Sequence, residues 1–254
     1  VDDYISYRHR IQHLPYRVIS LTGSSAHMRV IDPYSNKEKE MISFVSNDYL
    51  GLSHHPEVIK AGIDALEQYG AGAGASPLIG GHNFLHEQLE QEIAHFLKNE
   101  YAITYTSGYA ANCSTLLAMM GKEDIAIMDM FTHASVFDGC LCTNTKRFLH
   151  NDIDSLVHVL NNAKSFKNRF VIIDGVYSQD GDIAFLDQIY TVCKEHDAFL
   201  IVDDAHGIGV LGKTGRGIIE DYDLLDKVDI ITGTFSKAFG CVGGYAIARK
   251  ETVS

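Results

Sequence analysis

From Tyr101 onward, the sequence alternates between short apolar runs and longer amphipathic stretches. The apolar runs lie at residues 102–105, 125–128, 147–149, 170–173, 198–202 and 229–231. Stretches with helical periodicity separate most of them, at residues 109–120, 135–141, 153–163 and 186–196. This alternation predicts an α/β fold whose mostly parallel sheet is flanked by helices. A seventh run, residues 245–248, follows too closely for a helical crossover, so we expect an antiparallel strand there.

The chain before this alternation has a different character. Residues 32–40 are polar and predict a hairpin or a loop, whereas the glycine-rich residues 70–81 predict a long loop. Amphipathic helices are expected at about residues 56–69 and 84–97. We therefore divide the chain into an N-terminal segment, residues 1–52, and a large domain, residues 53–254. A new helix is expected to begin at residues 252–254, so we expect the chain to be truncated before a smaller C-terminal domain.

Charge and composition exclude several classes of partner. The net charge of −12 disfavours a surface for nucleic acid or for anionic membranes. No apolar run approaches the ~20 residues that a membrane span requires. The five cysteines are scattered and the thirteen histidines form no His-Glu-x-x-His pattern, so we expect a reduced, cytoplasmic protein without a structural metal.

Polar side chains follow two neighbouring strands of the expected sheet. Asp203 and His206 lie directly after the run at 198–202, and Lys237 follows the run at 229–231. The carboxyl ends of parallel strands meet at one edge of a sheet, where such folds bind their ligands. An amine that forms an imine and a carboxylate that keeps a ring nitrogen protonated suit an aldehyde cofactor. That cofactor is pyridoxal 5′-phosphate.

Other strand ends carry residues that suit the same cofactor. Ser107, Gly108 and Tyr109 lie between a strand and a helix, where backbone amides can bind a phosphate. His133 follows another strand end and could stack on a pyridine ring. Ser178 could donate a hydrogen bond to the cofactor, whereas Asn47 is most simply a turn residue.

A competing motif favours a different class of protein. Residues 207–214 match the phosphate-loop pattern G-x-x-x-x-G-K-T, which would indicate nucleotide binding. That pattern needs a helix beginning at Lys213, and Gly215 and Gly217 disfavour one. A regulatory or scaffolding protein without any cofactor is a third alternative.

Four motifs together carry a family resemblance: Ser46-Asn-Asp-Tyr-Leu-Gly51, His133-Ala-Ser135, Val202-Asp-Asp-Ala-His-Gly207 and Gly233-Thr-Phe-Ser-Lys237. They resemble the α-oxoamine synthases, pyridoxal-phosphate enzymes of fold type I, over about residue 40 to the end. These enzymes join an amino acid to an acyl-CoA thioester with loss of carbon dioxide. The resemblance therefore implies an acyltransferase with the large domain of that fold.

The resemblance also implies roles for individual residues. Lys237 would bond covalently to the cofactor, Asp203 would pair with its ring nitrogen, and His133 would stack on the ring. His206 would contact the phenolic oxygen, with Ser178 nearby, and Asn47 would lie near the substrate carboxylate. The phosphate would be held by Gly108 and Tyr109 with Thr234 and Ser236.

The same resemblance bears on substrates and assembly. Ser107-Gly-Tyr109 and Pro77 favour the biotin-pathway branch, which uses L-alanine and a pimeloyl thioester. Branches that use L-serine with palmitoyl-CoA, or glycine, are the alternatives. The family implies a homodimer with active sites at the subunit interface. It also implies a carboxylate-binding arginine and a partner-subunit phosphate contact, both beyond Ser254.

Overall fold

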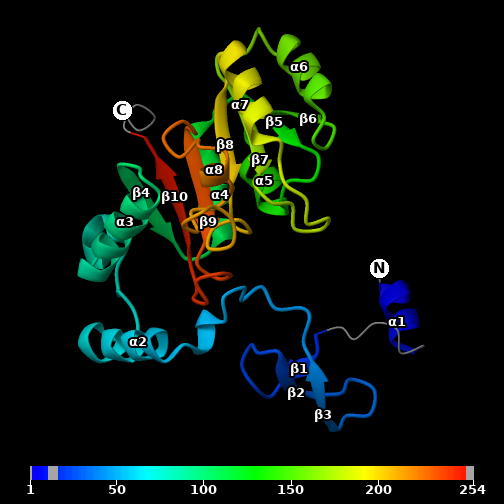
Figure 1. Cartoon of the computed structure of the whole chain (residues 1–254), viewed down its shortest axis with the longest axis vertical. Coiled ribbons are helices and arrows are strands. Elements are labelled where there is room, and N and C mark those ends of the chain that lie inside the picture. Colours follow the sequence, from blue (N-terminus) through cyan, green and yellow to red (C-terminus); the bar gives the residue numbers. More distant parts are fainter. Residues whose placement is uncertain (1, 11–16, 250–254) are drawn as a thin grey trace.

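The computed structural model describes residues 2–10 and 17–249, and its main feature is a seven-stranded sheet (Figure 1). The strand order is β4-β10-β9-β8-β7-β5-β6, and β10 alone runs against its neighbours. The fold and the antiparallel strand are thus as the sequence predicts. The strands are β4 Tyr101–Tyr105, β5 Ile125–Asp129, β6 Asn144–Phe148, β7 Arg169–Asp174, β8 Phe199–Asp203, β9 Ile230–Thr234 and β10 Gly244–Ala248.

Helices cover both faces of this sheet, as the connections between the strands require. The apolar side chains of α4 and α5 pack on one face, and those of α3, α6, α7 and α8 pack on the other. These helices are α3 Phe84–Phe96, α4 Gly108–Met119, α5 Ala134–Gly139, α6 Ile153–Asn161, α7 Leu186–Glu195 and α8 Ile218–Asp221. No helix in residues 2–10 and 17–249 is long and apolar enough to cross a membrane.

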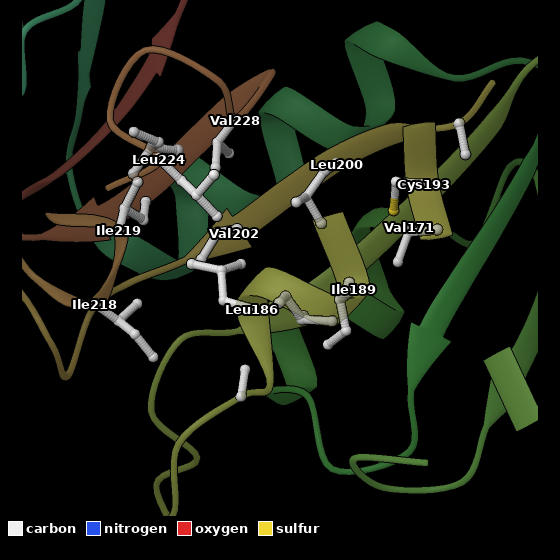
Figure 2. Close-up of a cluster of buried hydrophobic side chains, with 14 of the residues drawn as sticks. Val171, Leu186, Ile189, Cys193, Leu200, Val202, Ile218, Ile219, Leu224 and Val228 are labelled. Atoms are coloured by element: carbon white, nitrogen blue, oxygen red, sulfur yellow. The ribbon is translucent and has the colours of Figure 1, made fainter. Parts of the chain in front are cut away.

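The central strands are buried on both faces, which explains why they are almost continuously apolar. Successive residues of β5 point to opposite sides, so that Ile125 and Ile127 join one core cluster and Ala126 and Met128 join the other. Figure 2 shows the first cluster, in which Leu186, Ile189 and Cys193 of α7 lie against Val171, Leu200 and Val202 of the sheet. This packing fixes the strand ends that carry the polar motifs.

Strand β6 begins three residues before the predicted apolar run. Asn144, Thr145 and Lys146 belong to the strand although they are polar and exposed. Because β6 is the last strand of the sheet, it has a neighbour on one side only and its side chains need not be apolar. The pattern of apolar residues in the sequence therefore predicts only the buried C-terminal end of β6.

The N-terminal part forms a separate three-stranded antiparallel sheet (Figure 1). Its last two strands make the predicted hairpin across residues 32–40. The loop predicted at residues 70–81 is irregular until Pro77–Gly81, which form one short helical turn. The helix expected at residues 252–254 lies outside the described residues. The remaining elements are α1 Asp2–Arg10, β1 Ile19–Ser20, β2 His27–Ile31, β3 Glu38–Ile42, a 3-10 turn at Leu52–His54 and α2 Pro56–Tyr69.

Candidate active site

A cavity of about 240 Å³ lies at the carboxyl ends of β8 and β9, beside the N-terminus of α4. Five separate segments of the chain contribute its walls. Nine of the residues singled out in the sequence line it, together with Asn112, Asp174 and Ala205: Ser107, Gly108, Tyr109, His133, Asp203, His206, Thr234, Ser236 and Lys237. The structure thus brings the motifs from different strand ends into one site.

Lys237 and His206 contact each other in this cavity. The Nζ atom of Lys237 lies 2.7 Å from Nε2 of His206, whose Nδ1 lies 2.6 Å from the hydroxyl of Tyr49. Burial, followed by the Lys237 charge, lowers the pKa of His206 to about 4. Burial also lowers the pKa of Lys237, against the opposing effect of Asp203 and Asp174. The imidazole is therefore neutral at pH 7, and the amine loses its proton more readily than a surface lysine does.

Asp203 is held in one orientation by two donors. Its Oδ2 accepts a hydrogen bond of 2.6 Å from Nδ2 of Asn112, and its Oδ1 accepts one of 3.0 Å from the backbone N–H of Ala205. The side chain is buried at the end of β8 and faces the cavity. The site therefore presents a fixed carboxylate that can pair with a cationic group of a ligand.

His133 is fixed by a chain of hydrogen bonds behind the cavity wall. The backbone N–H of Ser135 donates to Nδ1 of His133 at 3.2 Å, and the Ser135 hydroxyl lies 2.7 Å from the same nitrogen. Asn112 donates in turn to this hydroxyl at 2.9 Å. Because Nδ1 accepts, a neutral His133 carries its proton on Nε2. Asn112 consequently links the orientations of His133 and Asp203.

The N-terminus of α4 borders the cavity with Ser107, Gly108 and Tyr109. Ser107 caps the helix by accepting a hydrogen bond from the N–H of Ala110 at 3.0 Å. A Cβ atom at Gly108 would lie 2.9 Å from Cβ of Thr234, so only glycine allows this close approach. The Thr234 hydroxyl lies 2.7 Å from that of Ser236. Backbone N–H groups, two hydroxyls and the positive end of a helix form a seat for an anion.

Two residues singled out in the sequence do not line the cavity. Ser178 is exposed in the turn that follows β7. Asn47 is also exposed, and its Oδ1 lies 3.4 Å from the hydroxyl of Tyr49, which itself contacts His206. Asn47 is thus connected to Lys237 only indirectly, through Tyr49 and His206.

Three polar residues of the site were missed by sequence reasoning. Asn112 orients Asp203, and Tyr49 contacts His206. Asp174 lines the cavity at the end of β7, beside Asp203 in the parallel register, and accepts a hydrogen bond of 3.3 Å from the N–H of His133. Burial, followed by the charge of Asp203, raises the pKa of Asp174 well above its ordinary value. Its position at a strand end was the available signal in the sequence.

The phosphate-loop pattern at residues 207–214 has another structural cause. No helix begins at Lys213 in the described chain, and α8 begins only at Ile218. The glycines instead surround Asp204, which is fully buried and accepts a hydrogen bond of 3.1 Å from the N–H of Ile218. A Cβ atom would lie 2.1 Å from its Oδ1 if added at Gly207 and 1.7 Å from its Oδ2 if added at Gly217. These glycines therefore make room for a carboxyl group of the chain itself.

We expect Gly217→Ala to destabilise the fold more than Gly215→Ala does. Both glycines have φ near +80°, so both substitutions carry backbone strain. Only at Gly217 would the new methyl group meet Asp204, since the nearest atom at Gly215 is 3.7 Å away. Overpacking of this kind costs about 1–3 kcal/mol in the free energy of unfolding. Urea unfolding of the two variants measures the difference, and equal losses would contradict the role given to Asp204.

Comparison with known proteins places this geometry in context. Residues 39–254 match the family model for aminotransferases of class I and II. The 8-amino-7-oxononanoate synthase of Saccharophagus degradans is 41% identical over 252 residues, which cover 98% of this chain and 62% of that protein.

Among solved structures, the serine palmitoyltransferase of Sphingomonas wittichii superimposes with a TM-score of 0.91 at 32% identity, covering 99% of this chain and 63% of that one. A serine palmitoyltransferase solved with PLP gives a TM-score of 0.90 at 32% identity, covering 98% of this chain and 63% of that one. The chain thus spans less than two thirds of the length of these relatives.

Proposed function

The chain belongs to the family of class I and II aminotransferases, and from this membership we propose that it is a pyridoxal-phosphate enzyme of the α-oxoamine synthase type. The observation that carries the proposal is the meeting of Lys237, His206 and Asp203 in one cavity beside the anion seat of α4. The proposed reaction joins an amino acid to an acyl-CoA thioester and releases coenzyme A and carbon dioxide.

The residues of the cavity fit this cofactor. Gly108 approaches Thr234 closely and the first residues of α4 line the cavity, where the N–H groups of a helix N-terminus suit a phosphate. Asp203 offers a carboxylate for a protonated ring nitrogen, and His133 offers a flat ring for stacking. The lowered pKa of Lys237 favours the neutral amine that reacts with an aldehyde. Ser236 offers a further hydroxyl donor to the phosphate, and Thr234, whose hydroxyl donates to the carbonyl of Gly243 at 2.8 Å, lies beside it.

Each of these residues has a defined task in the proposed reaction. When bound, pyridoxal phosphate supplies an aldehyde that bonds to amines and a ring that accepts the electron pair left at Cα of the amino acid. Lys237 would hold the cofactor covalently through Nζ and, once the substrate amine has taken its place, would accept the Cα proton at the same atom. Asp203 would keep the proton on the ring nitrogen, and His206 would contact the phenolic oxygen. His133 would orient the substrate against the ring.

We also propose that the protein is a cytoplasmic homodimer. The segments on either side of α2 expose large apolar side chains: Phe44 is 92%, Val45 89%, Leu78 98% and Ile79 86% exposed. In Figure 1 these segments run beyond the edge of the large sheet, where a second subunit can cover them. All five cysteines lie in the described residues and none forms a disulfide, which supports a reducing compartment.

L-Alanine and a pimeloyl thioester are the proposed substrates. Relatives named 8-amino-7-oxononanoate synthase support this choice, as does the Ser107-Gly-Tyr109 sequence. L-Serine with palmitoyl-CoA is the second candidate, because the serine palmitoyltransferase of Sphingomonas wittichii superimposes closely. Side chains that differ by one methyl or hydroxyl group are separated by only ~1–3 kcal/mol in an apolar pocket.

Titration of the full-length protein with single amino acids distinguishes these substrates. We expect L-alanine to change the visible absorption of the bound cofactor, and pimeloyl-CoA, added next, to release free coenzyme A. Glycine and L-serine serve as the comparison amino acids, and palmitoyl-CoA as the comparison thioester. Release of coenzyme A only with L-serine and palmitoyl-CoA would overturn the substrate assignment and leave the proposed cofactor in place.

A further inference from the structure

His150, in the loop after β6, bridges two carboxylates outside the cavity. Its Nδ1 lies 2.9 Å from Oδ1 of Asp129, and its Nε2 lies 2.8 Å from Oδ2 of Asp182. With both carboxylates ionised, each ring nitrogen of His150 donates a hydrogen bond and the ring is an imidazolium. The Asp129 side chain is fully buried at the end of β5, whereas that of Asp182 is 40% exposed. The bridge therefore joins a buried anion to a surface loop through an imidazolium.

The surroundings of His150 favour its charged form. Burial opposes the charge, but the hydrogen bonds to Asp129 and Asp182 outweigh it and raise the pKa of His150 above its ordinary value of 6.5. Tyr177, whose ring meets that of His150 edge-on, keeps its hydroxyl proton because burial raises its pKa. Asp174 lies further along the same edge of the sheet and interacts electrostatically with Asp129. The described groups around the ring are thus anionic or neutral.

The two carboxylates belong to loops that carry residues of the candidate site. Asp129 begins the loop to His133, and its Oδ1 also accepts a hydrogen bond of 2.8 Å from the N–H of Phe131. Asp182 closes the turn that carries Ser178, because its carbonyl accepts a hydrogen bond of 2.9 Å from the N–H of Tyr177. The His150 ring stacks on Phe131 at 4.4 Å and meets Tyr177 edge-on at the same distance. One imidazole therefore contacts both loops by charge and by packing.

Asn151 strengthens the same connection. Its backbone N–H donates to Oδ2 of Asp129 at 3.0 Å, and its side chain donates to Oδ2 of Asp182 at 3.0 Å. It makes both contacts from a left-handed backbone with φ of 52°, which is uncommon outside glycine. The loop after β6 is thus shaped to bring two neighbouring residues onto the same pair of carboxylates.

We propose that protonated His150 is a positioning residue that locks the loop of His133 to the loop of Ser178 at the edge of the cofactor cavity. The connection between the two loops does not depend on a cofactor. Its effect on cofactor binding rests on the proposed function. Loss of the imidazolium removes the charged bridge between the two carboxylates and leaves Asn151, which donates to both of them. Both loops then loosen together.

Hydrogen exchange of the cofactor-free protein tests the lock directly. We expect His150→Gln to speed exchange at the amides of Phe131, His133 and Tyr177 by about tenfold or more, the factor for one lost charge-assisted hydrogen bond. Exposed His158, on the neighbouring helix α6, provides the matched control His158→Gln, which should leave these amides unchanged. Unchanged exchange in His150→Gln would overturn the proposal.

The pH dependence of stability supplies an independent readout. Because the pKa of His150 is raised in the folded state, its contribution is complete below about pH 6.5 and is lost as pH rises through the folded value. The difference in Tm between the wild type and His150→Gln should therefore shrink as pH rises. A difference that grows with pH, or an NMR titration of His150 at 6.5 or lower, would contradict the proposal.

Cofactor affinity separates this inference from the proposed function. If both hold, His150→Gln weakens the binding of added pyridoxal phosphate by about tenfold, and His158→Gln does not. If the wild type binds no pyridoxal phosphate, the proposed function fails, while hydrogen exchange still decides the lock. Normal cofactor affinity in a His150→Gln protein whose loops exchange faster would overturn the consequence for the site.

Discussion

Lys237→Ala is expected to reduce turnover by about 10⁴-fold, the upper end of what a positioned base contributes. The substitution removes the amine that lies 2.7 Å from His206, and with it both the covalent partner of the cofactor and the group that accepts the Cα proton. Steady-state release of coenzyme A measures the loss. Cofactor should still bind through the phosphate seat of α4, but without a covalent bond.

Lys213→Ala is the matched control for this loss. Lys213 is exposed, and it is the lysine that the phosphate-loop alternative would require. We expect normal turnover from this variant. The reverse pattern, with Lys213 essential and Lys237 dispensable, would favour the nucleotide-binding alternative.

Asp203→Asn is expected to reduce turnover roughly 100-fold to 1,000-fold, as removal of one preorganised electrostatic group does in other sites. The neutral amide has nearly the shape of the carboxylate, yet it cannot hold a proton on the ring nitrogen by charge. One of its two present hydrogen bonds, from Asn112 or from Ala205, must also rearrange. Turnover, cofactor content and circular dichroism of the same sample distinguish an electronic effect from a loss of folding.

Asp174, the carboxyl group beside Asp203, provides the control variant for Asp203→Asn. Burial raises the pKa of Asp174, so Asp174→Asn replaces a group that tends to keep its proton by an amide of similar shape. We expect a much smaller loss of turnover from this variant. Equal losses from Asp174→Asn and Asp203→Asn would remove the special role assigned to Asp203.

Most of the large sheet could be predicted because its central strands are buried on both faces. Burial forces an apolar residue at most positions of β5, β7 and β8 and at the start of β9, so that the runs stand out in the sequence. Strand β6 was recognised only at its buried end, because its polar residues lie at the edge of the sheet. Backbone hydrogen bonds to the neighbouring strand β5, rather than apolar side chains, define this strand.

The site could be predicted where its residues lie in contiguous motifs after buried strands. Lys237, Asp203 and His206 are of this kind, since two neighbouring strand ends suffice to bring them together. Tyr49 and Asn112 could not be placed in this way. Tyr49 reaches His206 from a segment 157 residues away, and Asn112 reaches Asp203 from 91 residues away, both through tertiary packing. The glycines around Asp204 match a phosphate-loop pattern because a buried carboxyl group and a bound phosphate both require residues without side chains.

Reduction of the purified protein with borohydride, followed by peptide mass analysis, tests the central proposal most directly. Borohydride converts an imine into a stable secondary amine, so a bound cofactor stays on the lysine that holds it. The expected result is a yellow protein that carries the mass of one pyridoxyl phosphate group on the peptide containing Lys237. A label on another lysine, or a colourless protein that takes up no label after incubation with pyridoxal phosphate, would contradict the proposed function.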